Sequence, residues 1–214
     1  MAQIQMWKVA ACLLWLSVAL GLARAQNGPD ASQNSPRATE VEGTDVGEAI
    51  ERVAHAAGRA IGWVVASDDL KPCSVGKLTV LPGDPSGALD QITERCPRYT
   101  WVRHDSTVVI QPVGYLKDIV DLPIRDFSYE DIKASEAEYA VRALPEVKRW
   151  LQVNGLRELT VESGTKWTGV APRFSIDLHD VPLHQILDEI AVKSGRMTWR
   201  IVWFEHDTYL GIYL

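Results

Sequence analysis

The sequence predicts an α+β protein composed of two tandem β-α-β-β-α-β-β modules, with helices packed on small mixed sheets. Three observations lead to this prediction. Apolar residues recur at helical spacing in several short segments, they alternate in the segments between, and the end of the chain repeats an earlier part. We expect a signal peptide over residues 1–25, a disordered lead-in over 26–38, a first module over 39–113 and a second over 114–214.

The N-terminus has the pattern of a cleavable secretory signal peptide. Lys8 precedes an apolar run over residues 9–22, and the small-x-small segment Ala23-Arg24-Ala25 follows. This order predicts cleavage after Ala25, with an uncleaved membrane anchor as the alternative. The run is shorter than the roughly 20 apolar residues of a membrane-spanning helix. We therefore expect a protein that is periplasmic or secreted, with no stable membrane span after cleavage.

The composition of the mature chain bears on its partners. Removing residues 1–25 leaves 189 residues and takes the formal net charge from −6 to −8. No run of basic residues offers the electrostatic footprint that nucleic acid or an anionic membrane requires. We expect no nucleic-acid partner.

Two cysteines remain after cleavage, Cys73 and Cys96. An even pair in an exported protein predicts a disulfide, with two buried thiols as the alternative. Cys73 precedes an expected strand over residues 77–81, and Cys96 ends the helix that follows it. A helix packed back along its strand brings its C-terminus near the start of that strand, so the two sulfurs can meet.

The first helix of the first module is marked by apolar residues at intervals of four, three and four. Asp45 is its expected N-cap, with Glu48 three residues on, and Gly58 suits its end. The inward face is Val46, Ile50, Val53 and Ala57. A strand with alternating apolar residues follows at Ile61, Trp63 and Val65.

The second helix of this module is expected after the strand at 77–81. Asp84 is its expected N-cap and Pro85 its first residue, and the inward face is Leu89, Ile92 and Cys96. Two further strands, Tyr99–Arg103 and Thr107–Gln111, are expected to form a hairpin around residues 104–106.

The end of the chain repeats part of this module. Shifted by 98 positions, Ala88–Trp101 falls on Ile186–Trp199 without a gap. The residues of the first segment that recur unchanged are Leu89, Asp90, Ile92, Arg98, Thr100 and Trp101. An ungapped match in the core face and the exit turn indicates a duplicated supersecondary unit.

The rest of the second module matches less well. We expect an opening strand over Ile119–Ile124, helical stretches within Asp131–Leu151 that are interrupted at Pro145, and a strand at residues 159–161. A strand over Phe174–Leu178 should precede a helix opened by Asp180, as Asp84 opens its counterpart. Alternating apolar residues at Met197, Trp199, Ile201 and Trp203, and then residues 208–214, predict the two closing strands.

Both modules resemble a known family, the short N-terminal signalling domain of secretins and TonB-dependent outer-membrane transporters. The residues that carry the resemblance in the second module are Phe174–Leu178, Asp180, Val181, Leu183, Ile186, Leu187, Ile190, Gly195 and Trp199. In the first module they are Leu78–Leu81, Asp84, Ala88, Leu89, Ile92, Trp101 and Thr107–Gln111. The motif consists mostly of core and cap residues, so it bears on fold more than on function.

The resemblance implies a periplasmic module that works through contacts with envelope proteins, such as a secretin, a transporter or an anti-sigma regulator. The chain lacks the series of ~10-residue alternating strands that an outer-membrane barrel requires. We therefore expect neither a secretin nor a transporter, but a module that stands alone.

Residues with catalytic or metal-binding chemistry are scattered. His179 and His184 flank Asp180, but two ligands are too few for a metal site, and a solvated helix start is the simpler interpretation. Ser163 lacks the turn of a nucleophile elbow. We expect no enzyme, no catalytic residue, no metal and no cofactor, unless one of these histidines converges with an acid and with a nucleophile from the other module.

The expected function is therefore a non-enzymatic, exported interaction module or adaptor of the bacterial cell envelope. The alternative is a periplasmic protein that binds glycan or peptidoglycan through exposed aromatic side chains. Trp167 lies in a Ser/Gly/Thr-rich stretch and is the expected contact residue. The final strand of each module is also expected to present a free edge that a partner strand can join.

Overall fold

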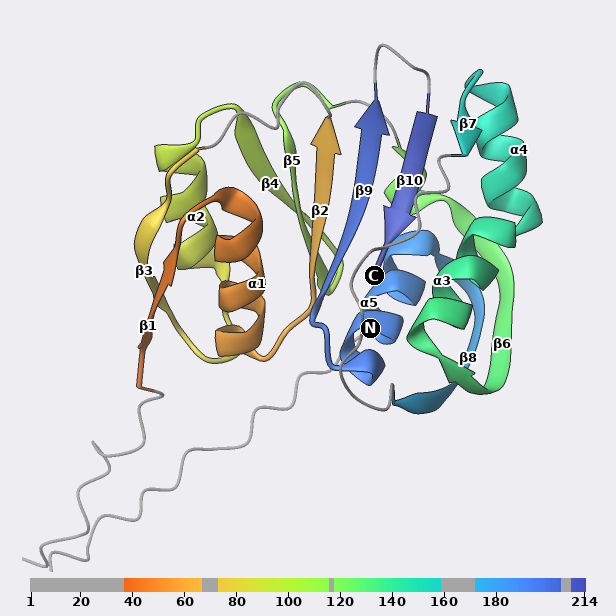
Figure 1. Ribbon diagram of the computed structural model, residues 1–214, viewed down its shortest axis with the longest axis horizontal. Helices are drawn as coiled ribbons and strands as arrows, with labels where there is room; N and C mark the ends of the chain where they lie inside the picture. The colour runs from red at the N-terminus through yellow and green to blue at the C-terminus, as the bar shows by residue number, and fades with distance from the viewer. Residues whose placement is uncertain (1–36, 67–72, 116–117, 159–171, 205–208) are drawn as a thin grey trace, which may run out of the picture. The chain divides into compact units, whose positions relative to one another are not determined.

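The structure is a computed structural model that describes residues 37–66, 73–115, 118–158, 172–204 and 209–214. It confirms the predicted α+β class: the described residues form five α-helices and ten strands, arranged in three sheets (Figure 1). The chain from Pro36 to Leu214 forms one compact unit.

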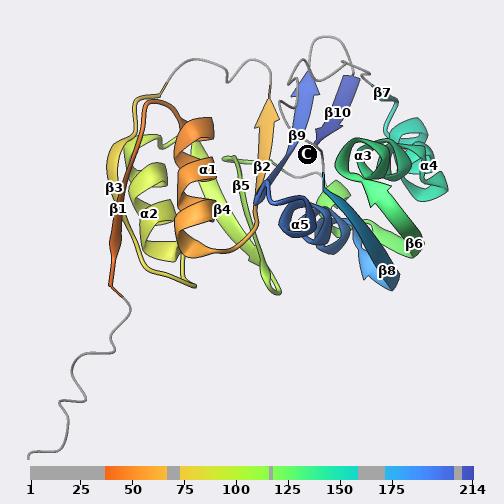
Figure 2. The same cartoon turned by 60° about the horizontal axis from the view of Figure 1, so that its bottom comes forward.

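The first half of this unit has the element order that the apolar periodicity predicts. The elements are β1 (Thr39–Gly43), α1 (Val46–Ala57), β2 (Ile61–Ala66), β3 (Gly76–Val80), α2 (Ser86–Arg95), β4 (Tyr99–His104) and β5 (Thr107–Pro112). Helices α1 and α2 lie between the two-stranded sheet β1-β3 and the strands β2, β4 and β5 (Figure 2).

The second half begins with a short 3-10 helix and contains one more α-helix than the first. The elements are η3 (Asp118–Asp121), β6 (Pro123–Lys133), α3 (Ala134–Ala143), α4 (Pro145–Val153), β7 (Arg157–Glu158), β8 (Arg173–Pro182), α5 (Leu183–Ser194), β9 (Thr198–Phe204) and β10 (Tyr209–Tyr213). Strands β6 and β8 form a long two-stranded ribbon that packs against α3 and α5.

The strand pairings follow the same pattern in the two halves. In the first, β1 pairs antiparallel with β3, β4 antiparallel with β5, and β2 parallel with β5. In the second, β6 pairs antiparallel with β8, β9 antiparallel with β10, and β7 parallel with β10. Strand β2 also pairs parallel with β9, which joins the halves in one six-stranded sheet of order β4-β5-β2-β9-β10-β7 (Figure 1).

The predicted cap of α1 is confirmed in detail. The Asp45 side chain accepts a hydrogen bond from the Glu48 amide, and Gly58 ends the helix in the left-handed conformation with a φ of 66°. Helix α2 begins one residue later than predicted, at Ser86, so that Pro85 occupies the capping position. The Asp84 carboxylate nevertheless accepts a 3.1 Å hydrogen bond from the Ser86 amide, so it still satisfies a free donor of the first turn.

Two predictions for the second half are wrong. Asp118–Asp121 is a 3-10 helix, so Ile119–Ile124 is not the opening strand, which is β6 instead. The helical stretches expected within Asp131–Leu151, with a break at Pro145, are confirmed, because α3 ends at Ala143 and α4 begins at Pro145. Apolar residues in a buried 3-10 turn and in a strand give the same short pattern, which explains the first error. Asp180 lies within β8 and does not open α5, whose capping position is Pro182. The strand expected at residues 159–161 lies outside the described residues.

The prediction that the final strand of each module presents a free edge is also wrong. Strand β5 lies between β4 and β2, and β10 lies between β9 and β7. Both strands are therefore paired on two sides, although β7 pairs only with Tyr209 and Leu210 of β10. The outer strands of the six-stranded sheet are β4 and β7 instead.

Each half has its own buried apolar cluster. The first is built around Ile50, Leu78, Leu89 and Ile92, and the second around Phe127, Ile186, Leu187 and Trp199. Cys73 and Cys96 lie at disulfide distance, with their Cα atoms 6.0 Å apart. The predicted meeting of the two sulfurs at the end of α2 is thereby confirmed.

Candidate functional site

An open groove lies beside strand β1, between this strand and helix α1. Three consecutive β1 residues, Glu40, Val41 and Glu42, contribute to its wall. Successive side chains of a strand point to opposite faces, so a groove that touches all three follows an edge of the strand. The other edge of β1 pairs with β3. The groove therefore runs along the edge of β1 that has no strand partner among the described residues.

The groove is acidic. Its side chains include four carboxylates, two permanent cations and a histidine: Glu40, Glu42, Glu48, Glu51, Arg52, Lys77 and His55. Both cations are already paired, because Arg52 contacts Glu48 at 2.6 Å and Lys77 contacts Glu40 at 3.5 Å. The remaining carboxylates, Glu42 and Glu51, are exposed and give the groove a net negative charge. Val41 and Ala56 add apolar surface.

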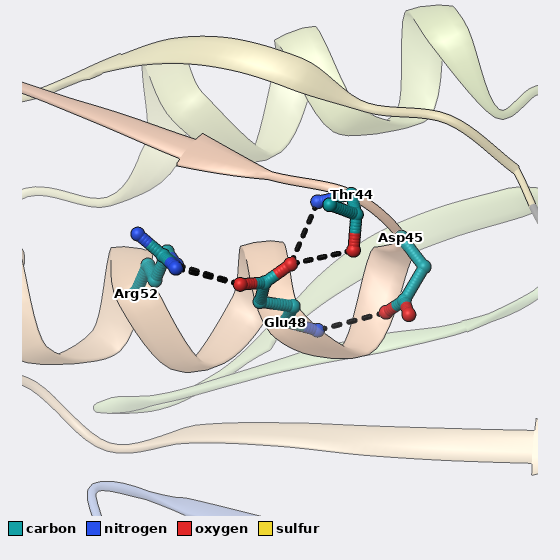
Figure 3. A network of polar contacts seen from close by, with 4 residues as sticks. All are labelled: Thr44, Asp45, Glu48 and Arg52. Atoms are coloured by element: carbon teal, nitrogen blue, oxygen red, sulfur yellow. Dashed lines mark hydrogen bonds and ion pairs between the residues drawn. The ribbon is translucent and has the colours of Figure 1, made fainter.

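The first turn of α1 fixes one of these carboxylates in place (Figure 3). The Glu48 side chain accepts a 2.6 Å hydrogen bond from the Thr44 hydroxyl and a 2.8 Å bond from the Thr44 amide, while Arg52 donates from the other side at 2.6 Å. Its own amide donates to Asp45. The carboxylate is therefore held at the helix N-terminus, where a negative charge is favoured.

These contacts lower the pKa of Glu48 to about 2, chiefly through the hydrogen bonds from Thr44 and then through Arg52. Glu48 therefore stays ionised at every pH at which the protein is expected to work. The ion pair of Glu48 with Arg52 is therefore a permanent feature of this end of the groove.

A second polar cluster is buried where α5 meets strand β5. The Thr107 hydroxyl lies 2.9 Å from Nδ1 of His184 and donates a 2.6 Å hydrogen bond to Asp188. The other oxygen of Asp188 accepts a 2.6 Å hydrogen bond from the Trp199 indole. Burial raises the pKa of Asp188 and lowers the pKa of His184. This cluster ties the first half, through Thr107, to the second.

His184 thus lies close to an acid, Asp188, and to a hydroxyl from the other half, Thr107, which is the arrangement that an enzyme would require. The arrangement does not offer a nucleophile to a substrate, because Thr107 is 0% exposed and His184 is 1% exposed. The Thr107 hydroxyl proton is directed to Asp188, so the histidine is not placed to remove it. The interpretation of His184 as part of a solvated helix start is wrong, because α5 packs this side chain against β5.

Two further histidines, His179 and His104, contact carboxylates, and His104 shares its partner Asp121 with His184. His179 is exposed on the β6-β8 ribbon, where it contacts Asp126 at 2.8 Å and Asp177 at 3.0 Å. His104, near the tip of the β4-β5 hairpin, contacts Asp121 at 2.9 Å. Within the described ranges, no group of three or more His, Cys, Asp or Glu side chains is placed to hold a metal ion.

Several residues named in the sequence analysis cannot be placed in this way. Trp167, Ser163 and the cleavage site at Ala25 lie outside the described residues. Trp199 is buried in the core, whereas Trp63 and Trp101 are partly buried. The β1-α1 groove was not anticipated, although Glu40, Glu42, Glu48 and Glu51 are all visible in the sequence. Periodicity alone does not show that a strand edge and a helix face are neighbours.

No protein-family model, curated protein or solved structure matches this chain. In the part of the chain that the structure describes, no helix is long and apolar enough to cross a membrane.

Proposed function

We propose that this protein is a non-enzymatic, exported interaction module of the bacterial cell envelope, and that it binds an extended segment of a partner protein in the β1-α1 groove. The observation that carries the proposal is the edge of β1 that no described strand covers, beside a groove walled by α1. An extended segment can add to such an edge through main-chain hydrogen bonds, while alternate side chains enter the neighbouring groove.

The charge of the groove selects the partner segment. The exposed carboxylates of Glu42 and Glu51 favour Lys or Arg side chains. Val41 and Ala56 offer a small apolar contact between them. The proposed partner segment is therefore extended and basic, with at least one apolar residue, and its binding should weaken as salt rises.

The envelope location is supported by two features. The pattern of residues 1–25 is that of a secretory signal peptide. Cys73 and Cys96 lie at disulfide distance, as is common in oxidising compartments. The shared pairing pattern of the two halves also supports duplicated modules of the secretin and transporter type, which in that family work through protein contacts.

The test is site-specific crosslinking in cells that produce the protein. A photoreactive side chain is placed at Glu40, and captured peptides are mapped by mass spectrometry. We expect capture of one protein through a segment rich in Lys or Arg. The double charge reversal Glu42→Lys with Glu51→Lys should abolish this capture, while the same change at the exposed positions Glu94 and Glu130, outside the groove, should leave it intact.

Two results would overturn the proposal. One is capture that is equally strong in the groove variant and in its matched control, because the groove charge would then play no part. The other is the absence of any protein adduct from Glu40 in cells where the protein is folded.

A further inference from the structure

The six-stranded sheet ends at β4, which among the described residues pairs only with β5. The corresponding strand of the second half, β9, has no free edge. Strand β2 pairs with it in parallel over six residue pairs, from Ile61 opposite Thr198 to Ala66 opposite Trp203. Of these two corresponding strands, β9 is covered by β2, whereas the equivalent edge of β4 is not covered by any described strand.

Two contacts show what the first half supplies at this seam, one from the covering strand β2 and one from the neighbouring strand β5. Gly62 lies opposite Trp199, and the indole occupies the space where a side chain would be: a Cβ at Gly62 would stand 2.2 Å from the ring. Beside it, the Thr107 hydroxyl donates to the carboxylate of Asp188, which already accepts from the same indole. The Asp188-Trp199 pair is therefore covered by two residues of the first half, Gly62 against the indole and Thr107 against the carboxylate.

The first half carries the same pair at its open edge. The Trp101 indole donates a 2.8 Å hydrogen bond to Asp90, as Trp199 does to Asp188. Asp90 is exposed and Trp101 is only partly buried. The residues that a covering strand contacts in the second half are thus present at β4, without a described strand to cover them.

The geometry points to β4 as a second docking site, one for a partner strand that runs parallel to β4 and places a glycine opposite Trp101. A larger residue at that position would meet the indole, as it would at Gly62. Main-chain hydrogen bonds to the β4 edge supply the affinity, and the glycine supplies the specificity. This site is separate from the acidic groove and does not depend on it.

The chain itself provides the probe. A synthetic peptide with the sequence of Ile61–Ala66, flanked by uncharged polar residues, is titrated into the isotope-labelled protein and followed by the amide signals of the protein. We expect shifts at Thr100–Arg103. A matched peptide in which the glycine is alanine should bind at least tenfold more weakly, because its methyl group would clash with Trp101.

The direction of the peptide is tested with a spin label at its N-terminus. In the parallel arrangement seen for β2 and β9, the label should broaden the signals near Thr100 more than those near His104. The proposal is overturned if the peptide shifts no β4 signals, if the glycine and alanine peptides bind equally, or if broadening is strongest near His104. The variant Asp90→Asn, which retains a well-dispersed spectrum if folded, should weaken binding without moving the groove signals.

Discussion

The indole nitrogen of Trp199 donates a hydrogen bond of 2.6 Å to a carboxylate oxygen of Asp188. The same bond, at 2.8 Å, joins Trp101 to Asp90 in the first half. In each case the acid lies on the helix and the indole on the following strand, 11 residues later. The bond holds the start of the strand against the preceding helix. This contact gives a physical reason for both residues to recur at a shift of 98 positions.

The two pairs differ in their surroundings. Asp90 is exposed, whereas Asp188 is partly buried and also accepts from Thr107. Both donors to Asp188 are buried, since Thr107 and Trp199 are at most 1% exposed, so each lost bond leaves a buried donor without its acceptor. The second pair should therefore matter far more to stability than the first.

Replacing Asp188 by Asn tests this difference. With the Asn oxygen on the Trp199 indole, the Asn amide nitrogen faces the Thr107 hydroxyl, which turns its proton to Nδ1 of His184, so the charge-assisted hydrogen bond from Thr107 to the carboxylate is lost. We expect a loss of about 1–3 kcal/mol in the free energy of unfolding, measured by urea denaturation. The matched change Asp90→Asn, at an exposed site, should cost less than about 1 kcal/mol. Equal losses in the two variants would contradict the assigned role of burial.

Sequence patterns predicted the first half of the fold more accurately than the second. The cap residues Asp45 and Gly58 mark a helix of ordinary length, and each strand around it has a simple alternation. In the second half, β6 extends over eleven residues with a register shift between Tyr129 and Ile132, which breaks the alternation. A pattern with period two cannot reveal such a strand.

The candidate sites could not be predicted from the sequence for a different reason. The acidic groove exists because β1 lies beside α1. The buried cluster exists because Thr107 contacts His184, which is 77 residues later in the chain. Each of these contacts is a consequence of tertiary packing. The sequence held one usable signal, the repeated Asp and Trp, because their equal spacing in the two halves indicates a contact common to both halves.

The stability of the fold should depend on pH through His184. Burial lowers the pKa of His184, so below about pH 6.5 the unfolded chain takes up a proton that the folded chain resists. The stabilisation is complete above the unfolded pKa and is lost as the pH falls, with a slope of at most about 1.4 kcal/mol per pH unit. The raised pKa of Asp188 acts in the opposite sense, because protonation relieves the cost of its buried charge.

A comparison of variants isolates the histidine. Unfolding is measured between pH 7.5 and pH 5 for the wild type, for His184→Gln and for His179→Gln, the last being an exposed control. We expect the loss of stability on acidification to be smaller in His184→Gln alone. A slope unchanged by this substitution would show that another group carries the pH dependence.

The cysteine pair should stabilise the folded chain. A disulfide between Cys73 and Cys96 closes a loop across 23 positions, which in the chain-entropy model is worth about 3 kcal/mol. We expect the double variant Cys73→Ala with Cys96→Ala to lose an amount of this order in urea denaturation. A reducing agent should lower the stability of the wild type and leave that of the double variant unchanged. Identical denaturation of the wild type with and without reductant would show that the bond is not formed.

The contact between Gly62 and Trp199 should make this position intolerant of any side chain. A Cβ at Gly62 would meet the buried indole at 2.2 Å, and the ring cannot retreat because Asp188 holds its nitrogen. We expect Gly62→Ala to destabilise the fold by about 1–3 kcal/mol through overpacking of the seam between β2 and β9. Gly87 is the matched control, since it lies in α2 and a Cβ there would meet no atom within 4 Å. Because alanine favours helix, Gly87→Ala should be neutral or stabilise by up to about 1 kcal/mol. If the two substitutions shift the unfolding midpoint equally, the indole is not packed against Gly62 in solution, and the seam between the halves is looser than the structure shows.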